Sequence, residues 1–315
     1  MEKGASSVDK KAAELVLGSV QLGLTYGVAN KTGQPSRRAA LRLVRQAADA
    51  GITQFDTARA YGDSEERLGE ALEGRKTRTI TKLSPLADLA ASATRNEIRA
   101  AVDSSIALSL SALRCERIDC LLLHRASHMT AFDGAIWERL LERLADGSVR
   151  TLGVSVQSPQ EALAALASGD VRHIQMPFNL LDWRWREAGV IVAIRQRMDV
   201  TVHARSVFLQ GLLAANDPSI WPRIDGVDPN SVLALVNNLA DEFGRESTAD
   251  LCLAYVRGQD FVDGAVVGLE TEEQLDINLR LALKRPLSES ECALIERRIV
   301  RLPVRLLDPA QWPKS

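Results

Sequence analysis

Eight short apolar runs, rich in β-branched residues, alternate along this chain with segments that have helical spacing. In residues 36–50 and 96–113, apolar side chains recur every three or four positions, which places them on one face of a helix. A buried strand followed by an amphipathic helix is the pattern of a parallel βα unit. The runs are residues 15–22, 54–57, 78–83, 120–124, 151–156, 173–178, 200–207 and 265–269.

Eight βα units in about 250 residues predict an α/β fold, the (β/α)8 or TIM barrel. We expect residues 1–315 to form a single domain of this kind. A doubly wound sheet usually needs fewer strands, and its nucleotide-binding form carries a GxGxxG turn after an early strand. Residues 18–23 read GSVQLG and do not fit that turn, so the barrel is favoured.

The charge balance argues against a polyanionic partner. The formal net charge is −2, from 39 basic and 41 acidic residues that are spread along the chain. Such a distribution produces no strong positive field. We therefore do not expect nucleic acid to bind.

Neither a membrane nor a metal is expected as a partner. Residues 1–7 lack the apolar core of a signal peptide, and no run of about 18 apolar residues occurs. Cysteines 115, 120, 252 and 292 lie far apart, without a CxxC pair or a Cys/His cluster at ligand spacing. These features predict a cytoplasmic protein with buried thiols.

Polar residues stand at the ends of several predicted strands. They are Asp56, Lys82, His124, Ser155, Gln175 and Arg205. In a barrel, chemistry is expected at the carboxyl ends of the strands and in the loops that follow. Any one of these side chains could merely satisfy backbone groups at the barrel mouth. Six at one end of the barrel indicate a functional site.

Four motifs at these strand ends resemble the aldo-keto reductase superfamily. Residues 55–65 read FDTARAYGDSE, 81–83 read TKL, 121–124 read LLLH and 152–155 read LGVS. The motifs follow the order of that superfamily, and the similarity extends from about residue 17 to residue 281. The resemblance implies a soluble oxidoreductase that interconverts an aldehyde or ketone with its alcohol, or a lactol with its lactone.

By this resemblance, the catalytic residues are Asp56, Tyr61, Lys82 and His124. Tyr61 would donate a proton in carbonyl reduction and accept one in alcohol oxidation. A free tyrosine has a pKa of about 10, so a neighbouring cation such as Lys82 is needed to favour the phenolate. Asp56 would keep Lys82 charged, and His124 would polarise the substrate oxygen. No metal is required for this chemistry.

Each of these four residues also has a purely structural interpretation. Asp56 and Lys82 could form an ion pair at the barrel mouth, and Tyr61 could pack on the rim. His124 could be satisfied by a carbonyl at the end of its strand. Perturbed groups gathered in one cleft nevertheless favour function over structure.

The superfamily binds a nicotinamide dinucleotide without a Rossmann fold. The resemblance implies that Ser155 and Gln175 hydrogen-bond the carboxamide, although Val156 stands where an asparagine is usual. Arg205 occupies the place of an aromatic residue that stacks on the nicotinamide, and could stack there or contact the pyrophosphate. It could equally pair with a carboxylate. Phe208 and Gly211 are expected along the phosphates.

After the eighth predicted strand, Gly268, Gln274 and Asn278 match the adenosine end of the superfamily's cofactor site. The residue expected to face a 2′-phosphate is Glu270. A carboxylate repels a phosphate but accepts hydrogen bonds from a free ribose hydroxyl, so NAD(H) is favoured over NADP(H). Alternatively, Glu270 simply precedes a helix that Thr271 caps.

Three residues are candidates for substrate binding: Arg59, Arg125 and Trp183. Arg125 follows His124 at a place where an aromatic residue is common, and it could bind a carboxylate, a phosphate or sugar hydroxyls. It could also form a surface ion pair, and Trp183 could pack against the rim. We expect a small polar carbonyl compound or sugar as substrate. Residues 214–230 are long enough to fold over the cofactor as a lid.

Two other functions remain open at this point. One is a barrel that senses a nucleotide with little turnover, although such a protein has no need of the four catalytic residues. The other is an unrelated sugar-phosphate enzyme, which would bind phosphate after the seventh and eighth strands without a nicotinamide. No long heptad pattern or internal repeat is present, so a monomer is the default expectation.

Overall fold

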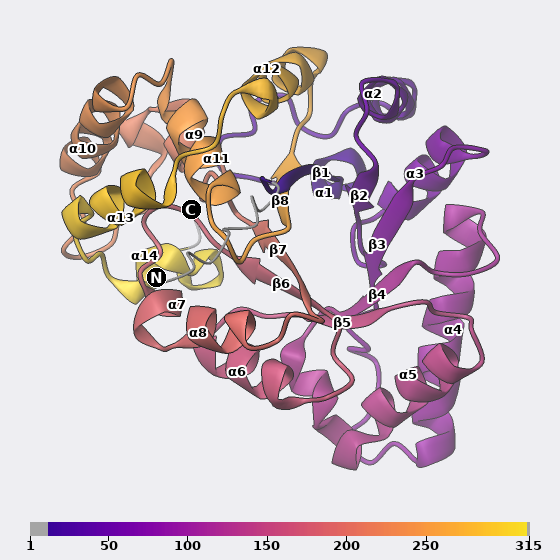
Figure 1. The fold of residues 1–315 in the computed structure, drawn as a ribbon. Helices are drawn as coiled ribbons and strands as arrows, with labels where there is room; N and C mark the ends of the chain where they lie inside the picture. Colours follow the sequence, from indigo (N-terminus) through magenta and orange to yellow (C-terminus); the bar gives the residue numbers. More distant parts are fainter. Residues whose placement is uncertain (1–11, 314–315) are drawn as a thin grey trace, which may run out of the picture.

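The computed structural model describes residues 12–313, in which eight parallel strands close a barrel in chain order (Figure 1). The first and last strands pair over five residues, from Glu14 with Gly264 to Gly18 with Gly268. The predicted (β/α)8 fold is confirmed. The strands are β1 (Glu14–Gly18), β2 (Gln54–Asp56), β3 (Arg78–Lys82), β4 (Cys120–Leu123), β5 (Leu152–Ser155), β6 (His173–Pro177), β7 (Thr201–Arg205) and β8 (Gly264–Gly268).

Helices surround the barrel (Figure 1). The longer ones are α2 (Arg37–Asp49), α3 (Ser64–Leu72), α4 (Arg95–Leu113), α5 (Ala135–Ala145), α6 (Pro159–Ala167), α10 (Pro229–Glu242), α11 (Thr248–Arg257), α12 (Glu272–Leu283) and α13 (Glu289–Arg298). The shorter ones are α1 (Val20–Gly23), α7 (Arg184–Glu187), α8 (Val190–Arg195), α9 (Leu212–Ala215) and α14 (Val304–Leu307), with 3-10 turns η1 (Ala126–Met129), η2 (Ala131–Gly134), η3 (Pro218–Ile220) and η4 (Pro309–Gln311).

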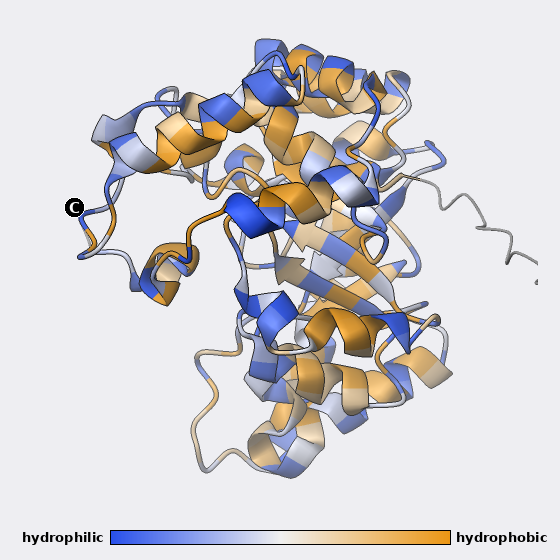
Figure 2. Cartoon of the chain, turned by 60° about the vertical axis from the view of Figure 1, so that its left-hand side comes forward, coloured by the Kyte–Doolittle hydropathy of each residue, from blue (hydrophilic) through white to orange (hydrophobic). Residues whose placement is uncertain are grey.

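The two amphipathic segments singled out in the sequence are α2 and α4. The Ser36 side chain caps α2 by accepting from the Ala39 N–H, and Thr94 and Glu97 form a capping box on α4. Their apolar faces pack inward; Leu43 and Val44 of α2 are fully buried. Figure 2 shows helices that carry both apolar and polar segments, as a helix between a core and water should.

The first strand is shorter than the apolar run predicts. It ends at Gly18 rather than at residue 22, and the chain turns into α1. Ser19 makes this turn, because its N–H and its hydroxyl both donate to the Asp56 carbonyl, at 2.9 and 2.7 Å. Leu22 is buried as predicted, but it belongs to the short helix α1 and not to a strand. The other strands lie within about two residues of their predicted limits.

None of the helices within residues 12–313 is long and apolar enough to cross a membrane. The segment 1–7, in which the sequence shows no signal-peptide core, lies outside the described residues.

Candidate active site

A cavity of about 1130 Å³ opens at the carboxyl end of the barrel, where the sequence predicts the site. This volume is slightly above the usual range for small-molecule sites, about 300–1,000 Å³. Of the predicted catalytic group, Asp56, Tyr61 and His124 line it, and Lys82 lies directly behind them. The cavity has room for a ligand larger than a simple aldehyde.

Lys82 and Asp56 form a buried ion pair at the ends of β3 and β2. The Lys82 Nζ donates to both carboxylate oxygens of Asp56, at 2.8 and 2.9 Å, and to the Thr57 carbonyl at 2.9 Å. Only 1% of the Lys82 side chain is exposed. Burial alone lowers the pKa of this lysine, but the nearby Asp56 carboxylate and Tyr61 outweigh it, so the pKa is raised. Lys82 therefore stays charged in a dry environment.

Tyr61 lies on the loop between β2 and α3, beside this ion pair. The Lys82 Nζ is 5.0 Å from the centroid of the Tyr61 ring. The loop is held by backbone bonds from the Tyr61 N–H to the Ala58 carbonyl and from the Ser64 N–H to the Tyr61 carbonyl, both 3.0 Å. Gly23 packs on the same loop so closely that a Cβ there would lie 1.8 Å from the Tyr61 carbonyl oxygen. The phenol is thus placed by two segments of the chain.

His124 follows β4 and faces Tyr61 across the cavity. The two ring centroids are 5.7 Å apart and the rings are nearly perpendicular, at 87°. Burial, then the charges of Lys82, Arg205 and Arg125, lower the pKa of His124 to about 3. The imidazole is therefore neutral near pH 7 and can donate an N–H to an acceptor.

Gln175 lies in the barrel but does not line the cavity. Its side-chain nitrogen donates to Asp56 Oδ2 at 2.6 Å, and its side chain is fully buried. The sequence predicts that Gln175 binds a carboxamide, whereas in the structure its side-chain nitrogen donates to the Asp56 carboxylate. Asp56 thereby has two side-chain donors.

The other predicted cofactor residues lie along the cavity. They are Ser155, Arg205, Phe208, Gly211, Gly268, Glu270, Gln274 and Asn278. Thr271 caps α12 by accepting from the Gln274 N–H at 3.2 Å, as the alternative for this segment predicts. The Glu270 N–H donates to the Gln274 side chain at 2.7 Å, and burial raises the pKa of the half-buried Glu270 carboxyl.

Residues after β1 that were not among the predicted site residues also line the cavity. Gln21 Oε1 is buried and has no hydrogen-bond partner among residues 12–313. A Cβ added at Gly268 would lie only 2.3 Å from this oxygen. A second group is Tyr26, Ala29 and Lys31, on the loop after α1. The rule that βα loops form a barrel site was a signal for this loop. No such signal pointed to Gln21, because the sequence predicted that residues 15–22 form a strand.

These features fit an elongated polar ligand such as a nicotinamide dinucleotide. Gln21 supplies an unpartnered acceptor, and Gly268 leaves space beside it. Gly211 has a φ of +93°, and a Cβ there would lie 2.6 Å from the Ala29 Cβ, so a side chain would close the cavity. The charged Arg205 is within the same lining.

The predicted substrate residues separate in space. Arg125 lines the cavity, and its guanidinium has no ion-pair or hydrogen-bond partner within the described part of the chain. Arg59 is instead ion-paired with the buried Glu65, which also accepts from Thr81 at 2.6 Å. Arg59 does not line the cavity.

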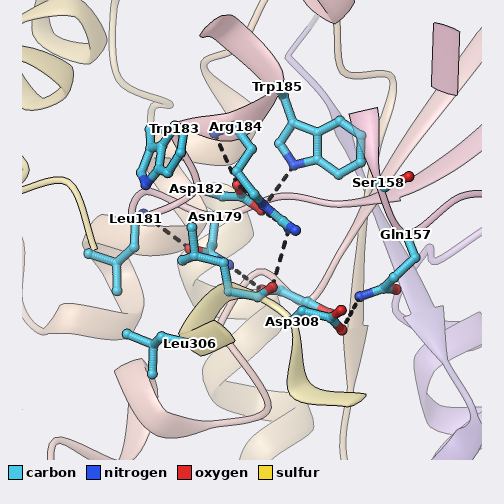
Figure 3. Close-up of polar contacts among 12 residues, drawn as sticks. Gln157, Ser158, Asn179, Leu181, Asp182, Trp183, Arg184, Trp185, Leu306 and Asp308 are labelled. Carbon is cyan, nitrogen blue, oxygen red and sulfur yellow. Dashed lines mark hydrogen bonds and ion pairs between the residues drawn. The ribbon is translucent and has the colours of Figure 1, made fainter. Parts of the chain in front are cut away.

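Trp183 also lies away from the cavity. Its indole N–H donates to the Leu302 carbonyl at 3.0 Å, and the Arg301 guanidinium lies 4.1 Å from its ring centroid. Figure 3 shows Trp183 beside the network of Asp182, Arg184 and Trp185. The structural alternative for this tryptophan, packing at the rim, agrees with its position.

Residues 214–230, which were expected to form a lid, are anchored in the core at two positions and are otherwise exposed or half-buried. Ala214 and Ala215 line the cavity, but Trp221 and Ile224 are buried in the hydrophobic core. Within residues 12–313, no cluster of three or more metal-ligating side chains occurs, and the four cysteines are free thiols, three of them buried.

Comparison with known proteins agrees with this geometry. The profile of the Aldo/keto reductase family matches residues 14–299. L-glyceraldehyde 3-phosphate reductase of Escherichia coli (strain K12) is 25% identical over 320 residues, which cover 90% of each chain. The uncharacterized oxidoreductase YqkF of Bacillus subtilis (strain 168) is 26% identical over 304 residues, 93% of this chain and 94% of that one.

Solved structures show the same fold. The aldo-keto reductase AKR11C1 from Bacillus halodurans, in its holo form, superposes with a TM-score of 0.72 at 22% identity. The superposition covers 95% of this chain and 96% of that one. The match of the family profile over nearly the whole chain, on a barrel of this kind, shows that the chain belongs to the aldo/keto reductase family.

Proposed function

We propose that this protein is an NAD(P)-dependent carbonyl oxidoreductase in which Tyr61 exchanges the proton. The observation that carries the proposal is the position of Lys82, bonded to both oxygens of Asp56 and 5.0 Å from the centre of the Tyr61 ring. The lysine charge stabilises negative charge on the phenol oxygen when its proton leaves. The same charge, held in a buried site, is preorganised for this task.

Carbonyl reduction adds a hydride to carbon and a proton to oxygen. A bound nicotinamide supplies or accepts the hydride. Tyr61 supplies the proton, and neutral His124 donates a hydrogen bond to the oxygen on which charge develops. Neither function needs a metal ion. In the reverse direction Tyr61 accepts the proton of the alcohol.

The cofactor would lie along the lining between Ser155 and Asn278, with Gln21 as an additional acceptor. NAD(H) is preferred in this proposal because Glu270 has no cationic partner among the described residues and faces the cavity. A 2′-phosphate close to that carboxylate would be repelled.

The substrate in this proposal is a small polar carbonyl compound or sugar. Arg125 and Arg205 at the cavity support a polar substrate over a greasy one. The relative from Escherichia coli is named as a reductase of L-glyceraldehyde 3-phosphate, which is such a compound. We propose a monomeric protein, which sedimentation analysis tests. Four free thiols support the cytoplasm as its location.

A barrel that senses nucleotide without turnover is the second candidate. It keeps the same cofactor lining but makes no use of the Tyr61 proton. The buried Lys82–Asp56 pair costs desolvation energy that a binding protein has no reason to bear.

The test compares the intact protein with Tyr61→Phe. NADH and NADPH are titrated against intrinsic tryptophan fluorescence, and turnover is assayed on a panel of aldehydes and aldoses. We expect Tyr61→Phe to lower kcat by about 10²- to 10⁴-fold, the usual worth of general acid catalysis, while the nucleotide Kd is unchanged. Binding without turnover in the intact protein would favour the sensing barrel, and failure to bind either nucleotide would refute both.

A further inference from the structure

Two arginines flank the catalytic end of the cavity. Arg205 is the last residue of β7, and Arg125 directly follows His124 at the end of β4. Both line the cavity, and the charges of both contribute to the lowered pKa of His124, after burial and Lys82. Two cations are therefore close to the residue proposed to polarise the carbonyl.

No carboxylate among the described residues neutralises either arginine. Arg205 Nη2 donates to two neutral acceptors, the Val156 carbonyl at 3.2 Å and Gln157 Oε1 at 2.6 Å. The Arg125 guanidinium forms no hydrogen bond or ion pair with any residue between 12 and 313.

The acidic residues of this end of the cavity are already engaged. Asp56 is paired with Lys82. Glu161 accepts from the backbone N–H groups of Gln157 and Ser158, at 2.6 and 3.3 Å. The catalytic end of the cavity is thus left with an excess of positive charge.

Arg205 is also held in one orientation. Gln157 accepts from it through Oε1, while Gln157 Nε2 donates to Asp308 Oδ1 at 2.8 Å. Asp308 is buried and accepts from Gln311 Nε2 at 2.7 Å and from the Ala310 N–H at 3.2 Å. Because the Gln157 amide is engaged at both ends, it cannot flip without losing both bonds. Figure 3 shows Gln157 reaching from the β5 side of the barrel to Asp308 on the C-terminal segment.

We propose that Arg125 and Arg205 form an anion-binding subsite for the substrate, which selects carbonyl compounds that carry a carboxylate or phosphate. This inference rests on the proposed function. Guanidinium groups bind such anions through paired, charge-assisted hydrogen bonds. Since Arg125 and His124 line the same cavity and the Arg125 charge acts on the imidazole, we expect the anionic group and the carbonyl to belong to one small substrate. Gln157 and Asp308 are positioning residues, which act through Arg205.

The test measures kcat/KM, with the preferred reduced nicotinamide, for matched substrates that differ in the anion. Succinic semialdehyde is compared with butanal, and glyceraldehyde 3-phosphate with glyceraldehyde. We expect the intact protein to favour the anionic member of at least one pair by about 10-fold or more. The pair that shows the preference distinguishes a carboxylate from a phosphate. The KM of the anionic member should rise with ionic strength.

Arg125→Gln and Arg205→Gln should each lower kcat/KM for the anionic substrate by about 10- to 100-fold, chiefly through KM. The neutral substrate should lose less, so that the ratio of kcat/KM for the anionic over the neutral member falls by about 10-fold or more in each variant. Arg38→Gln, which removes an exposed guanidinium from α2 outside the cavity lining, is the control and should leave both unchanged.

Gln157→Glu provides a variant that keeps both arginines. Its carboxylate would neutralise Arg205 and face Asp308, so the preference for the anionic substrate should fall while turnover of the neutral one persists. A general loss of structure would lower both activities together, and thermal unfolding checks for it.

Two outcomes would overturn the subsite. One is equal kcat/KM for both members of each pair in the intact protein. The other is a nucleotide Kd that rises as much as KM in the arginine variants, which would assign the arginines to the cofactor. Either result leaves the Tyr61→Phe test standing, so failure of the subsite is distinct from failure of the proposed oxidoreductase.

Discussion

Gln175 donates from its side-chain amide to the carboxylate of Asp56, at 2.6 Å, on the oxygen that also accepts from Lys82 at 2.9 Å. The two residues are 119 positions apart in the sequence. This bond links β6 to the ion pair between Asp56 of β2 and Lys82 of β3. We propose that Gln175 positions the Asp56 carboxylate.

The first prediction tests this role with Gln175→Leu. Loss of a hydrogen bond to a charged group costs about 1.5–3 kcal/mol, and here it would loosen Asp56 and hence Lys82. We expect kcat to fall by about 10- to 100-fold with little change in the nucleotide Kd. Fluorescence titration and steady-state kinetics measure the two quantities. A large increase in the nucleotide Kd with an unchanged kcat would instead indicate that Gln175 binds the carboxamide of the cofactor.

The second prediction concerns the choice of nucleotide at Glu270. Glu270→Gln removes the negative charge and should shift the ratio of kcat/KM for NADPH over NADH upward by about 10-fold or more. Glu273→Gln is the matched control, because it makes the same change in the first turn of α12 but outside the cavity lining. Equal shifts in both variants would assign the effect to the helix end, not to a contact with the ribose.

The third prediction is a loss of stability in acid. Burial, then Arg78 and Lys82, lower the pKa of His203 to about 3, against 6.5 in an unfolded chain. Between these values the unfolded state binds a proton that the folded state does not, so the free energy of unfolding falls as pH falls from 6.5 towards 3. At pH 5 the loss is about 2 kcal/mol for one such histidine.

His173 should contribute in the same direction. Its ring lies 4.3 Å from that of His203, and burial, His203 and Arg78 hold its pKa well below the usual value. Urea unfolding at pH 7.5 and pH 5 measures the effect. His203→Gln should reduce the proton uptake on unfolding by about one at pH 5. An unchanged pH slope in that variant would contradict the assignment.

The fourth prediction tests how Tyr61 is placed. A Cβ at Gly23 would lie 1.8 Å from the Tyr61 carbonyl oxygen and 2.8 Å from the Ser64 nitrogen, so Gly23→Ala must displace backbone. We expect kcat to fall by about 10-fold or more, since small misplacements of catalytic groups are costly. Gly169→Ala, where nothing lies within 4 Å of the added atom, is the control. If both variants keep full activity, the contact with Gly23 does not place the phenol.

Periodicity in the sequence determined the barrel. The patterns typical of a strand and of an amphipathic helix depend only on residues close in the sequence. Eight successive βα units leave few arrangements that bury all their apolar faces. The limits of β1 were wrong because Ser19 bonds to the Asp56 carbonyl, 37 residues away, and turns the chain into α1. A bond of that range leaves no trace in a local pattern.

The sequence by itself also brought Asp56, Tyr61, Lys82 and His124 to one end of the barrel. Residues at the carboxyl ends of parallel strands must meet at the same rim, so their neighbourhood follows from topology and needs no knowledge of packing.

Tertiary structure decided which groups bond to one another at that rim. In the structure the Gln175 amide donates to Asp56, and Arg59 forms an ion pair with Glu65. The Trp183 indole donates to the Leu302 carbonyl. Tertiary structure also joined Gln157 to Asp308 across 151 residues. A hydrogen bond forms only when donor and acceptor lie about 3 Å apart at a suitable angle. Whether two distant segments approach each other that precisely depends on the packing of the whole barrel. Residue type and sequence spacing do not encode that packing.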